Sequence, residues 1–206
     1  FIFPAFNQIV SEAARMYYRT NGDYSVPIVI RAPYGGGVRG GLYHSQSVEA
    51  YFAHVPGLKV VVPSNPHDAK GLLKAAIRDN NPVLFFEHKL AYNTVQGDVP
   101  EGNYTVPLGK AAVRREGQQL SLISYGLSVH HCLEAAETLA AEGISCEVVD
   151  LRSVSPLDTR TLLESVKKTG RVCIVHEDNL TGGVGAEVAA IVAKDAFEYL
   201  DAPVQR

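Results

Sequence analysis

The strongest constraint on the fold is a regular alternation between short, uninterrupted apolar runs and longer segments with one apolar stripe at helical spacing. A short apolar run is typical of a strand that is buried on both faces of its sheet, and the stripe is typical of a helix packed on a core. Strands and helices that alternate along a chain usually form a parallel sheet covered by helices. The sequence therefore predicts the α/β class.

The first half of the chain opens on a helical pattern. Apolar residues recur at helical spacing from Phe6 to Tyr17, and Asn21-Gly22 can end that helix. Asn65-Pro66 can begin a later helix, because Asn caps free N–H groups and Pro fits the first turn. The predicted strands are 26–30, 58–62 and 83–86, and the later helix reaches about residue 78. Because no strand precedes the first helix, we expect the N-terminal part of this domain to be missing.

The pattern restarts after residues 88–107, a stretch with few periodic apolar residues that we interpret as an interdomain link. Ser128 and Asp158 are placed to cap two of the helices that follow. The predicted strands of this half are 120–124, 146–151 and 171–175, and the helices are 128–141, 158–168 and 185–199. The sequence thus predicts two parallel-sheet, three-layer domains, at 1–107 and 108–206.

Composition excludes several classes of protein. The 206 residues include 19 basic and 22 acidic side chains, which give a formal charge of −3 and no basic footprint for nucleic acid. No apolar run is long enough to predict a membrane span. Cys132, Cys146 and Cys173 are widely spaced and odd in number, so we expect core thiols and neither a disulfide framework nor a metal site.

A glycine-rich segment, Gly35–Gly41, precedes the most reactive candidate side chain. Its residues Gly35–Gly40 fit the G-x-G-x-x-G pattern, but the segment does not open a helix directly after a strand, so a dinucleotide site is disfavoured. We interpret it as a mobile active-site loop that presents His44, although a flexible loop without a ligand stays open. An imidazole can exchange a proton near neutral pH, and no nucleophile elbow surrounds Ser45 or Ser47.

The remaining motifs are weaker. His130 and His131 are neighbours in a predicted helix and point in different directions, so we expect one to be buried and the other exposed. His176–Asp178 follows a predicted strand, which suits either a ligand site or a plain polar cluster. Thr181–Gly185 could bring backbone close to a ligand or to a partner chain.

Taken together, several stretches resemble the β subunits of thiamine-diphosphate-dependent 2-oxo acid dehydrogenases. The stretches that carry the resemblance are Phe1–Ile9, Arg31–Gly35, Leu42–Ser47, Pro56–Val61, Ala69–Leu73, Ile77–Pro82, Val149–Arg152 with Pro156 and Asp158, and Thr181–Gly183. Leu42–His44 and Phe85–Lys89 look most like the branched-chain, 2-oxoisovalerate type. The pyruvate- and acetoin-acting members of the family stay open as alternative assignments.

The resemblance implies a transketolase-like pyrimidine-binding domain followed by a transketolase C-terminal-type domain, with C-terminal sequence missing. It implies an α2β2 heterotetramer in which thiamine diphosphate is shared with the α subunit and Mg2+ is held by α. The acyl product would pass to a lipoyl acyltransferase component. We expect a cytoplasmic location in a bacterium or archaeon, and the mitochondrial matrix in a eukaryote.

The resemblance also implies roles for individual residues. Phe1 matches an aromatic residue that packs on the aminopyrimidine ring, and His44 matches a catalytic histidine implicated in acyl transfer to lipoamide. A structural K+ site, formed mostly by backbone carbonyls with Asp and Asn oxygens, is matched by Val26, Ile28, Val29, Ala76, Asp79 and Asn81. The family's thiamine-activating glutamate would lie before Phe1, so we expect this chain alone to be inactive.

Two other classes of function stay open. A transketolase or deoxyxylulose-phosphate synthase would show basic phosphate-binding residues around the site, and the sequence shows no such group. A non-catalytic assembly subunit would make no cofactor contact through Phe1 or His44. Purification with an α chain and titration with thiamine diphosphate would discriminate between these readings.

Overall fold

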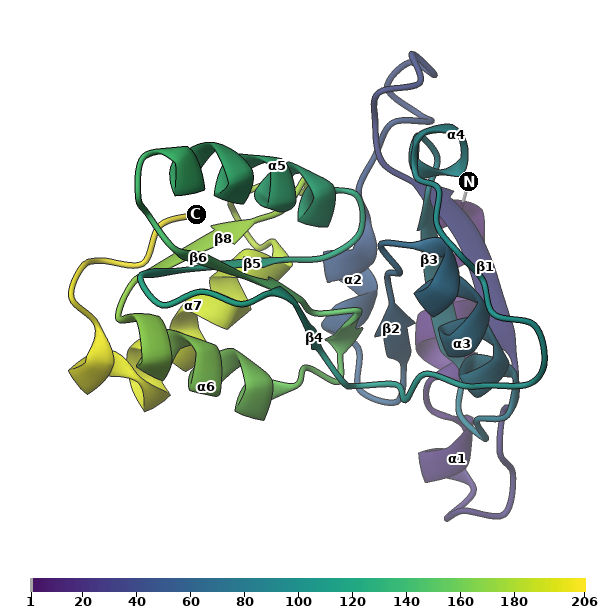
Figure 1. Cartoon of the computed structure of the whole chain (residues 1–206). Helices are drawn as coiled ribbons and strands as arrows, with labels where there is room; N and C mark the ends of the chain where they lie inside the picture. Colours follow the sequence, from purple (N-terminus) through teal and green to yellow (C-terminus); the bar gives the residue numbers. More distant parts are fainter. Residues whose placement is uncertain (1) are drawn as a thin grey trace.

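The computed structural model describes residues 2–206 and has two lobes that lie side by side (Figure 1). Each lobe is built on a four-stranded sheet. The first sheet contains, in spatial order, β1 (Val29–Tyr34), β3 (Val83–His88), β2 (Lys59–Val61) and β7 (Ser153–Ser155). The second contains, in spatial order, β4 (Ala112–Arg115), β6 (Cys146–Asp150), β5 (Leu120–Ser124) and β8 (Val172–Val175).

Helices cover both sheets. Those of the first half are a 3-10 turn at Phe3–Ala5, a π-helix at Gln8–Ala13, α1 (Met16–Arg19), α2 (Glu49–Ala53), α3 (Pro66–Ile77) and α4 (Ala91–Thr94). Those of the second half are α5 (Ser128–Ala141), α6 (Thr159–Thr169), α7 (Val184–Asp195) and a 3-10 turn at Phe197–Tyr199. In the described part of the chain, no helix combines the length and the apolar character that crossing a membrane requires.

The sheets are mixed rather than wholly parallel. β7 pairs antiparallel with β2, and β4 pairs antiparallel with β6, while the other strand pairs are parallel. β7 belongs in sequence to the second half but completes the sheet of the first. The two predicted parallel sheets are therefore parallel at the centre, and each carries an antiparallel edge strand that no apolar run in the sequence marks.

Local capping chemistry explains where two predicted helices begin. Asp158 caps α6, since its side chain accepts a hydrogen bond from the Thr161 N–H, as the sequence predicted. The prediction for Ser128 is wrong. Leu127 occupies the cap position of α5 without a side-chain bond, and Ser128 is a buried residue of the first turn.

The first strand lies further along the chain than its apolar run suggests. It begins at Val29 and extends through Pro33, whereas Ile28 is 41% exposed. β1 is at the end of the strand order, and an edge strand tolerates a proline that cannot donate a hydrogen bond to a neighbour. The polar residue Arg31 turns outward and forms a bidentate ion pair with Glu87 on β3.

Alternate side chains of the central strands enter different cores. Leu84 and Phe86 point into a core that also contains Phe52 of α2 and continues into the second lobe through Ile123 and Val188. The side chains of β3 that face the opposite way pack under α3 in a separate cluster. The second sheet has a corresponding cluster under α5. One apolar core therefore spans both lobes.

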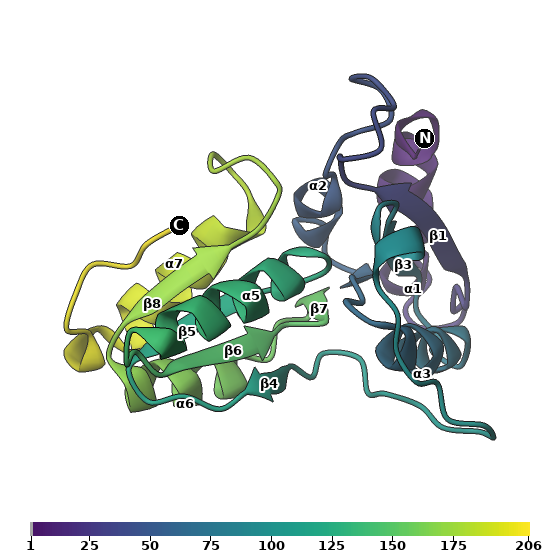
Figure 2. The ribbon, with the colours of Figure 1, turned by 45° about the horizontal axis from the view of Figure 1, so that its top comes forward.

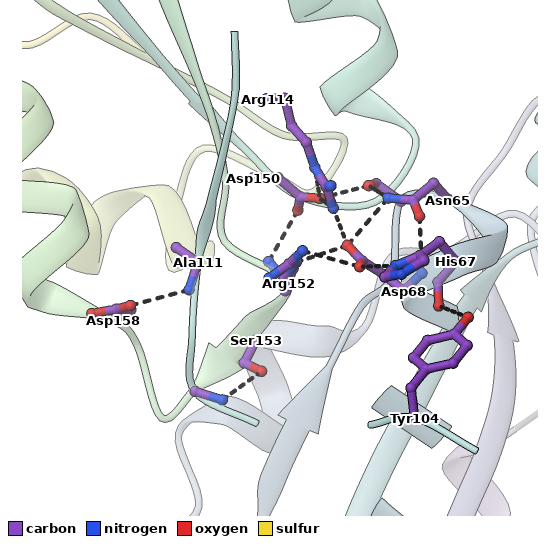
Figure 3. A network of polar contacts seen from close by, with 12 residues as sticks. Asn65, His67, Asp68, Tyr104, Ala111, Arg114, Asp150, Arg152, Ser153 and Asp158 are labelled. Carbon is purple, nitrogen blue, oxygen red and sulfur yellow. Dashed lines mark hydrogen bonds and ion pairs between the residues drawn. The ribbon is translucent and has the colours of Figure 1, made fainter. Parts of the chain in front are cut away.

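A buried ionic network also crosses between the lobes (Figure 3). Asp68, in the first turn of α3, is fully buried and forms ion pairs with Arg114 of β4 and with Arg152, which follows β6. Asp150 accepts hydrogen bonds from Arg114 at 2.8 Å and from the Ser64 hydroxyl at 2.6 Å. Burial opposes ionisation of Asp68, but the two arginines outweigh it and lower its pKa.

Candidate functional site

His44 lies on the loop between β1 and α2, the glycine-rich segment that the sequence predicted to present it. This loop and the loop between β8 and α7 project from the same side of the molecule (Figure 2). The His44 side chain is exposed, and the backbone N–H of His44 donates to the Gly41 carbonyl at 3.3 Å. The backbone of the loop is tight, because a Cβ on Gly40 would lie 2.8 Å from the His44 Cβ.

The N-terminal turn lies against the His44 loop. Phe1, the predicted ring-stacking residue, falls outside the described residues. The next two residues, Ile2 and Phe3, line a narrow crevice together with Tyr43 and His44. The structure therefore brings the imidazole close to the start of the chain.

A polar pocket of about 310 Å³ opens beside this crevice. Phe3 and Tyr51 form its aromatic side, with their ring centroids 5.5 Å apart in an edge-to-face arrangement. Apart from Val48, the rest of the lining is polar and comes from the loop after His44 and from the segment after β8: Ser45, Gln46, Ser47, Glu177, Asp178 and Asn179. Of the strand-end residues flagged in the sequence, Glu177 and Asp178 thus form part of a wall of this pocket, and His176 does not.

Sequence reasoning missed a buried acid next to the pocket. Glu49, the first residue of α2, is fully buried, and its Oε1 accepts a hydrogen bond from the Tyr125 hydroxyl at 2.9 Å. Burial raises the pKa of Glu49 to about 7. The sequence gives no signal for Glu49, because the residues around it carry no predicted element or motif.

His176 completes this buried group. Its ring stacks on Tyr125 at 6.1 Å, and among the described residues neither ring nitrogen has a hydrogen-bond partner. Burial lowers the pKa of His176, which favours the neutral imidazole. The glycines flagged at Thr181–Gly185 have a local explanation, because a Cβ on Gly185 would lie 2.4 Å from the His176 Nε2.

The segments of the predicted K+ site also lie together. The Val26 N–H donates to the Asn80 carbonyl at 3.2 Å, and the Val83 N–H donates to the Ile28 carbonyl at 3.0 Å. One oxygen of Asp79 accepts from the backbone and side-chain amides of Asn81, and the other forms an ion pair with Lys59. Burial opposes ionisation of Asp79, but Lys59 and Asn81 lower its pKa. The site itself stays a prediction.

The other predicted histidines behave as expected. His130 is half-buried and donates from Nε2 to the Ser64 carbonyl at 2.7 Å, whereas His131 is exposed. The three cysteines are free thiols, two of them buried and Cys173 half-buried. Among residues 2–206, no group of three or more His, Cys, Asp or Glu is arranged to hold a metal ion. This leaves the expectation of Mg2+ ligands on another subunit untested.

The linings suit one end of thiamine diphosphate. Around the His44 loop the described residues offer aromatic rings, hydroxyls and an imidazole, and Lys89 is the one cation in the linings of the crevice and the polar pocket. The polar pocket also has two carboxylates, Glu177 and Asp178. Aromatic and hydroxyl groups fit an uncharged ring, whereas a diphosphate favours several cations or helix N-termini and is repelled by carboxylates. The residues present therefore fit the ring end of the cofactor.

Two family models match consecutive parts of the chain. Residues 1–95 match the transketolase pyrimidine-binding domain, and residues 109–206 match the transketolase C-terminal domain. A solved structure described as an inactive β4 tetramer of a split-gene transketolase aligns with a TM-score of 0.72 and 26% identity. The alignment covers 95% of this chain and 63% of that one.

Three curated relatives match over the whole of this chain. The 2-oxoisovalerate dehydrogenase subunit β of Bacillus subtilis is 59% identical over 206 residues, which are 63% of its length. The mitochondrial 2-oxoisovalerate dehydrogenase subunit β of Dictyostelium discoideum is 50% identical over 56% of its length. The pyruvate dehydrogenase E1 component subunit β of Bacillus subtilis is 49% identical over 63% of its length.

The chain thus spans about 60% of the length of these relatives. Both transketolase-type domains are present, in the order that the resemblance implied, and the matches to the three relatives cover the whole of this chain. The chain belongs to the family of thiamine-diphosphate-dependent 2-oxo acid dehydrogenase β subunits.

Proposed function

We propose that this chain supplies the β-subunit half of the active site of a branched-chain 2-oxo acid dehydrogenase. The enzyme decarboxylates 3-methyl-2-oxobutanoate and related acids and passes the acyl group to a lipoyl group. The 59% identity with a 2-oxoisovalerate dehydrogenase subunit β supports the branched-chain substrate class. The structural observation that carries the proposal is the shared crevice of His44 and the N-terminal turn, next to a polar pocket.

The chain's own part in the chemistry is to position substrate and to move a proton. Thiamine diphosphate, when bound, supplies the nucleophilic carbon and accepts the electron pair that carbon dioxide leaves behind. When the lipoyl disulfide opens, one sulfur takes the acyl group and the other leaves as a thiolate. His44 donates the proton that this thiolate takes up. The aromatic residues of the crevice hold rings in place without adding charge.

Assembly with other chains follows from the same proposal. An α subunit completes an α2β2 heterotetramer and holds the diphosphate and Mg2+, and a lipoyl acyltransferase component receives the acyl group. Among the described residues, Lys89 is the one lysine or arginine that lines the crevice and the polar pocket, which supports a partner that carries the charged end of the cofactor. The assembly works in the cytoplasm of a bacterium or archaeon, or in the mitochondrial matrix of a eukaryote, which fractionation of the source cells tests.

The K+ site belongs to the proposal as a structural element. The proposed ligands are Val26, Ile28, Val29, Ala76, Asp79 and Asn81. The Val26 N–H donates to the carbonyl of Asn80, the residue between Asp79 and Asn81, and backbone carbonyls together with a carboxylate suit a hard cation. In the assembled enzyme, replacing K+ by tetramethylammonium should lower the melting temperature, and Asp79→Ala should abolish that dependence. Equal melting temperatures in both salts would contradict the site.

The decisive experiment is reconstitution of the β subunit with its α subunit and thiamine diphosphate. We expect kcat/KM for 3-methyl-2-oxobutanoate to exceed that for pyruvate by at least about tenfold, since a fitted apolar pocket distinguishes one or two methyl groups by about that factor. A preference for pyruvate or acetoin would overturn the branched-chain assignment. Pyruvate is the serious rival, because a pyruvate dehydrogenase subunit is 49% identical over the whole chain.

The same assembly tests the role of His44. Replacing the imidazole by Ala should lower the rate of lipoyl acylation by about 100-fold, the usual cost of losing a positioned acid. Dye-coupled decarboxylation, which needs no lipoyl group, should change much less. His131→Ala removes an exposed imidazole and serves as the matched control. Normal acylation by the His44→Ala enzyme would refute the role.

A further inference from the structure

Glu177 has no part in the chemistry proposed above, yet it reaches from the second lobe to the base of the His44 loop. It follows β8, and its Oε1 accepts a hydrogen bond from the Gly36 N–H at 2.5 Å. Its Oε2 lies 2.5 Å from the Nε2 of His88, the last residue of β3. One carboxylate therefore contacts two elements of the first lobe; Glu177, Gly36 and His88 together are called the Glu177 bridge below.

The hydrogen bonds of His88 determine which ring nitrogen carries the proton. The Leu90 N–H donates to Nδ1 at 3.3 Å, so Nδ1 presents a lone pair. Nε2 then carries the proton and donates it to the Glu177 carboxylate. The His88 side chain is 2% exposed, whereas the Glu177 side chain is 35% exposed, so the imidazole is shielded from water and the carboxylate reaches it from the open pocket.

The loop backbone is fitted to the same imidazole. Gly35 has a φ of +84°, and a Cβ at this position would lie 2.1 Å from the His88 Nε2. The Gly35 N–H donates to the Gln46 carbonyl at 3.0 Å, which closes the base of the loop. Every residue from Gly36 to Ser45, His44 included, therefore lies on a loop whose base is fixed against His88 and Glu177.

The Glu177 bridge also forms part of the polar pocket. Glu177 lines that pocket together with Asp178 and Asn179, opposite the loop residues Ser45 and Gln46. The hydrogen bond from His88 lowers the pKa of Glu177 and keeps its carboxylate charged. A charged acceptor makes both hydrogen bonds stronger than a neutral one would.

We propose that Glu177 is a positioning residue, which ties the base of the His44 loop to the second domain and so holds the imidazole at the pocket. The inference rests on the proposed function for the role of His44 in acyl transfer. It explains why the carboxylate that follows β8 in the second domain contacts the glycine-rich loop of the first domain. It also makes the position of His44 depend on how the two domains pack.

The experiment uses the β subunit assembled with its α subunit and compares Glu177→Ala, Glu177→Gln and the control Glu187→Gln. Glu187 is an exposed carboxylate on α7, ten positions along the chain. In Glu177→Gln the amide oxygen can still accept from Gly36, but the amide NH2 opposes the proton on His88. This variant should therefore fall between wild type and Glu177→Ala.

The first readout is amide hydrogen exchange, which does not depend on activity. Exchange of the peptide that covers residues 35–46 should rise at least about tenfold in Glu177→Ala and stay unchanged in Glu187→Gln. Unchanged exchange in β5 and β6 shows that each variant is folded. If exchange of the 35–46 peptide does not rise in Glu177→Ala, the bridge does not hold the loop and the inference fails.

The second readout separates positioning from a general structural role. In Glu177→Ala, kcat for lipoyl acylation should fall at least about tenfold, and by more than the rate of dye-coupled decarboxylation falls, while Glu187→Gln leaves both rates unchanged. Faster loop exchange with normal acylation would overturn the positioning role. If the wild-type assembly acylates no lipoyl group at all, the proposed function fails, and hydrogen exchange still decides whether the bridge exists.

Discussion

Glu49 is a buried acid that should contribute to the pH response of this molecule. It is fully buried, its pKa rises from 4.5 to about 7, and the Tyr125 hydroxyl donates a hydrogen bond to its Oε1. The cause is burial, because the neutral acid loses less hydration free energy than the carboxylate when water is removed. Its charge state therefore changes within the physiological pH range.

This shift predicts how stability depends on pH. The folded state binds the Glu49 proton more tightly than the unfolded chain does, so the contribution of Glu49 is complete below pH 4.5 and is lost as pH rises through about 7. The loss amounts to about 3 kcal/mol of unfolding free energy. In denaturant unfolding at several pH values, Glu49→Gln should flatten the profile between pH 5 and about 8.

The control for this measurement is Glu164→Gln, which neutralises an exposed carboxylate on α6. It should leave the pH profile parallel to that of the wild type, because water and salt screen the interactions of an exposed carboxylate. A Glu49→Gln variant with the wild-type slope would show that another group carries the pH dependence.

At the scale of elements, the ionic network on Asp68 joins α3 to the strands of the other lobe. Arg114 and Arg152 keep only 22% and 15% of their side-chain surface exposed, so they depend on the carboxylate for compensation. Removing one member of a buried ion pair lowers the free energy of unfolding by more than the intact pair contributes to it, because the remaining charge stays desolvated. The network therefore makes the contact between the lobes specific.

We expect Asp68→Ala to lower the free energy of unfolding by about 3 kcal/mol, measured by denaturant titration. The matched control is Glu164→Ala, which removes the exposed partner of Arg160 in an i,i+4 pair and should cost less than about 1 kcal/mol. Equal effects of the two substitutions would mean that the network contributes no more than an ordinary surface ion pair.

At the scale of the whole molecule, the two lobes share one core and one strand. Buried residues from the N-terminal helical segment to α7 form a continuous apolar cluster, and β7 of the second half completes the first sheet. Neither lobe can open this interface without exposing apolar surface and unpaired backbone groups to water.

This arrangement predicts cooperative unfolding. In scanning calorimetry the chain should show one transition, with a calorimetric enthalpy close to the van't Hoff enthalpy. Two separate transitions would show that the shared core and the Asp68 network contribute little to coupling between the domains. Asp68→Ala provides an internal comparison. This variant weakens the contact between the lobes, so its single transition should broaden before two separate transitions appear.

Several parts of this structure follow from the sequence alone. α3, α6 and β5 lie close to where their patterns placed them, because capping residues and apolar periodicity are local properties of the chain. The glycine-rich loop that carries His44 could likewise be recognised, since glycines at positive φ mark an irregular turn. The family was identifiable because its motifs are spread along nearly the whole chain.

Other features were decided only by tertiary structure. β4 and β7 are short edge strands that exist through their pairing with distant partners, and their own residues carry little signal. The raised pKa of Glu49 and the Glu177 bridge depend on groups that are far apart in sequence and meet only where the domains pack. The apolar periodicity of the sequence indicates which residues are buried. The fold alone determines which groups lie next to a buried ionisable side chain, and those neighbours set the pKa and the role of that side chain.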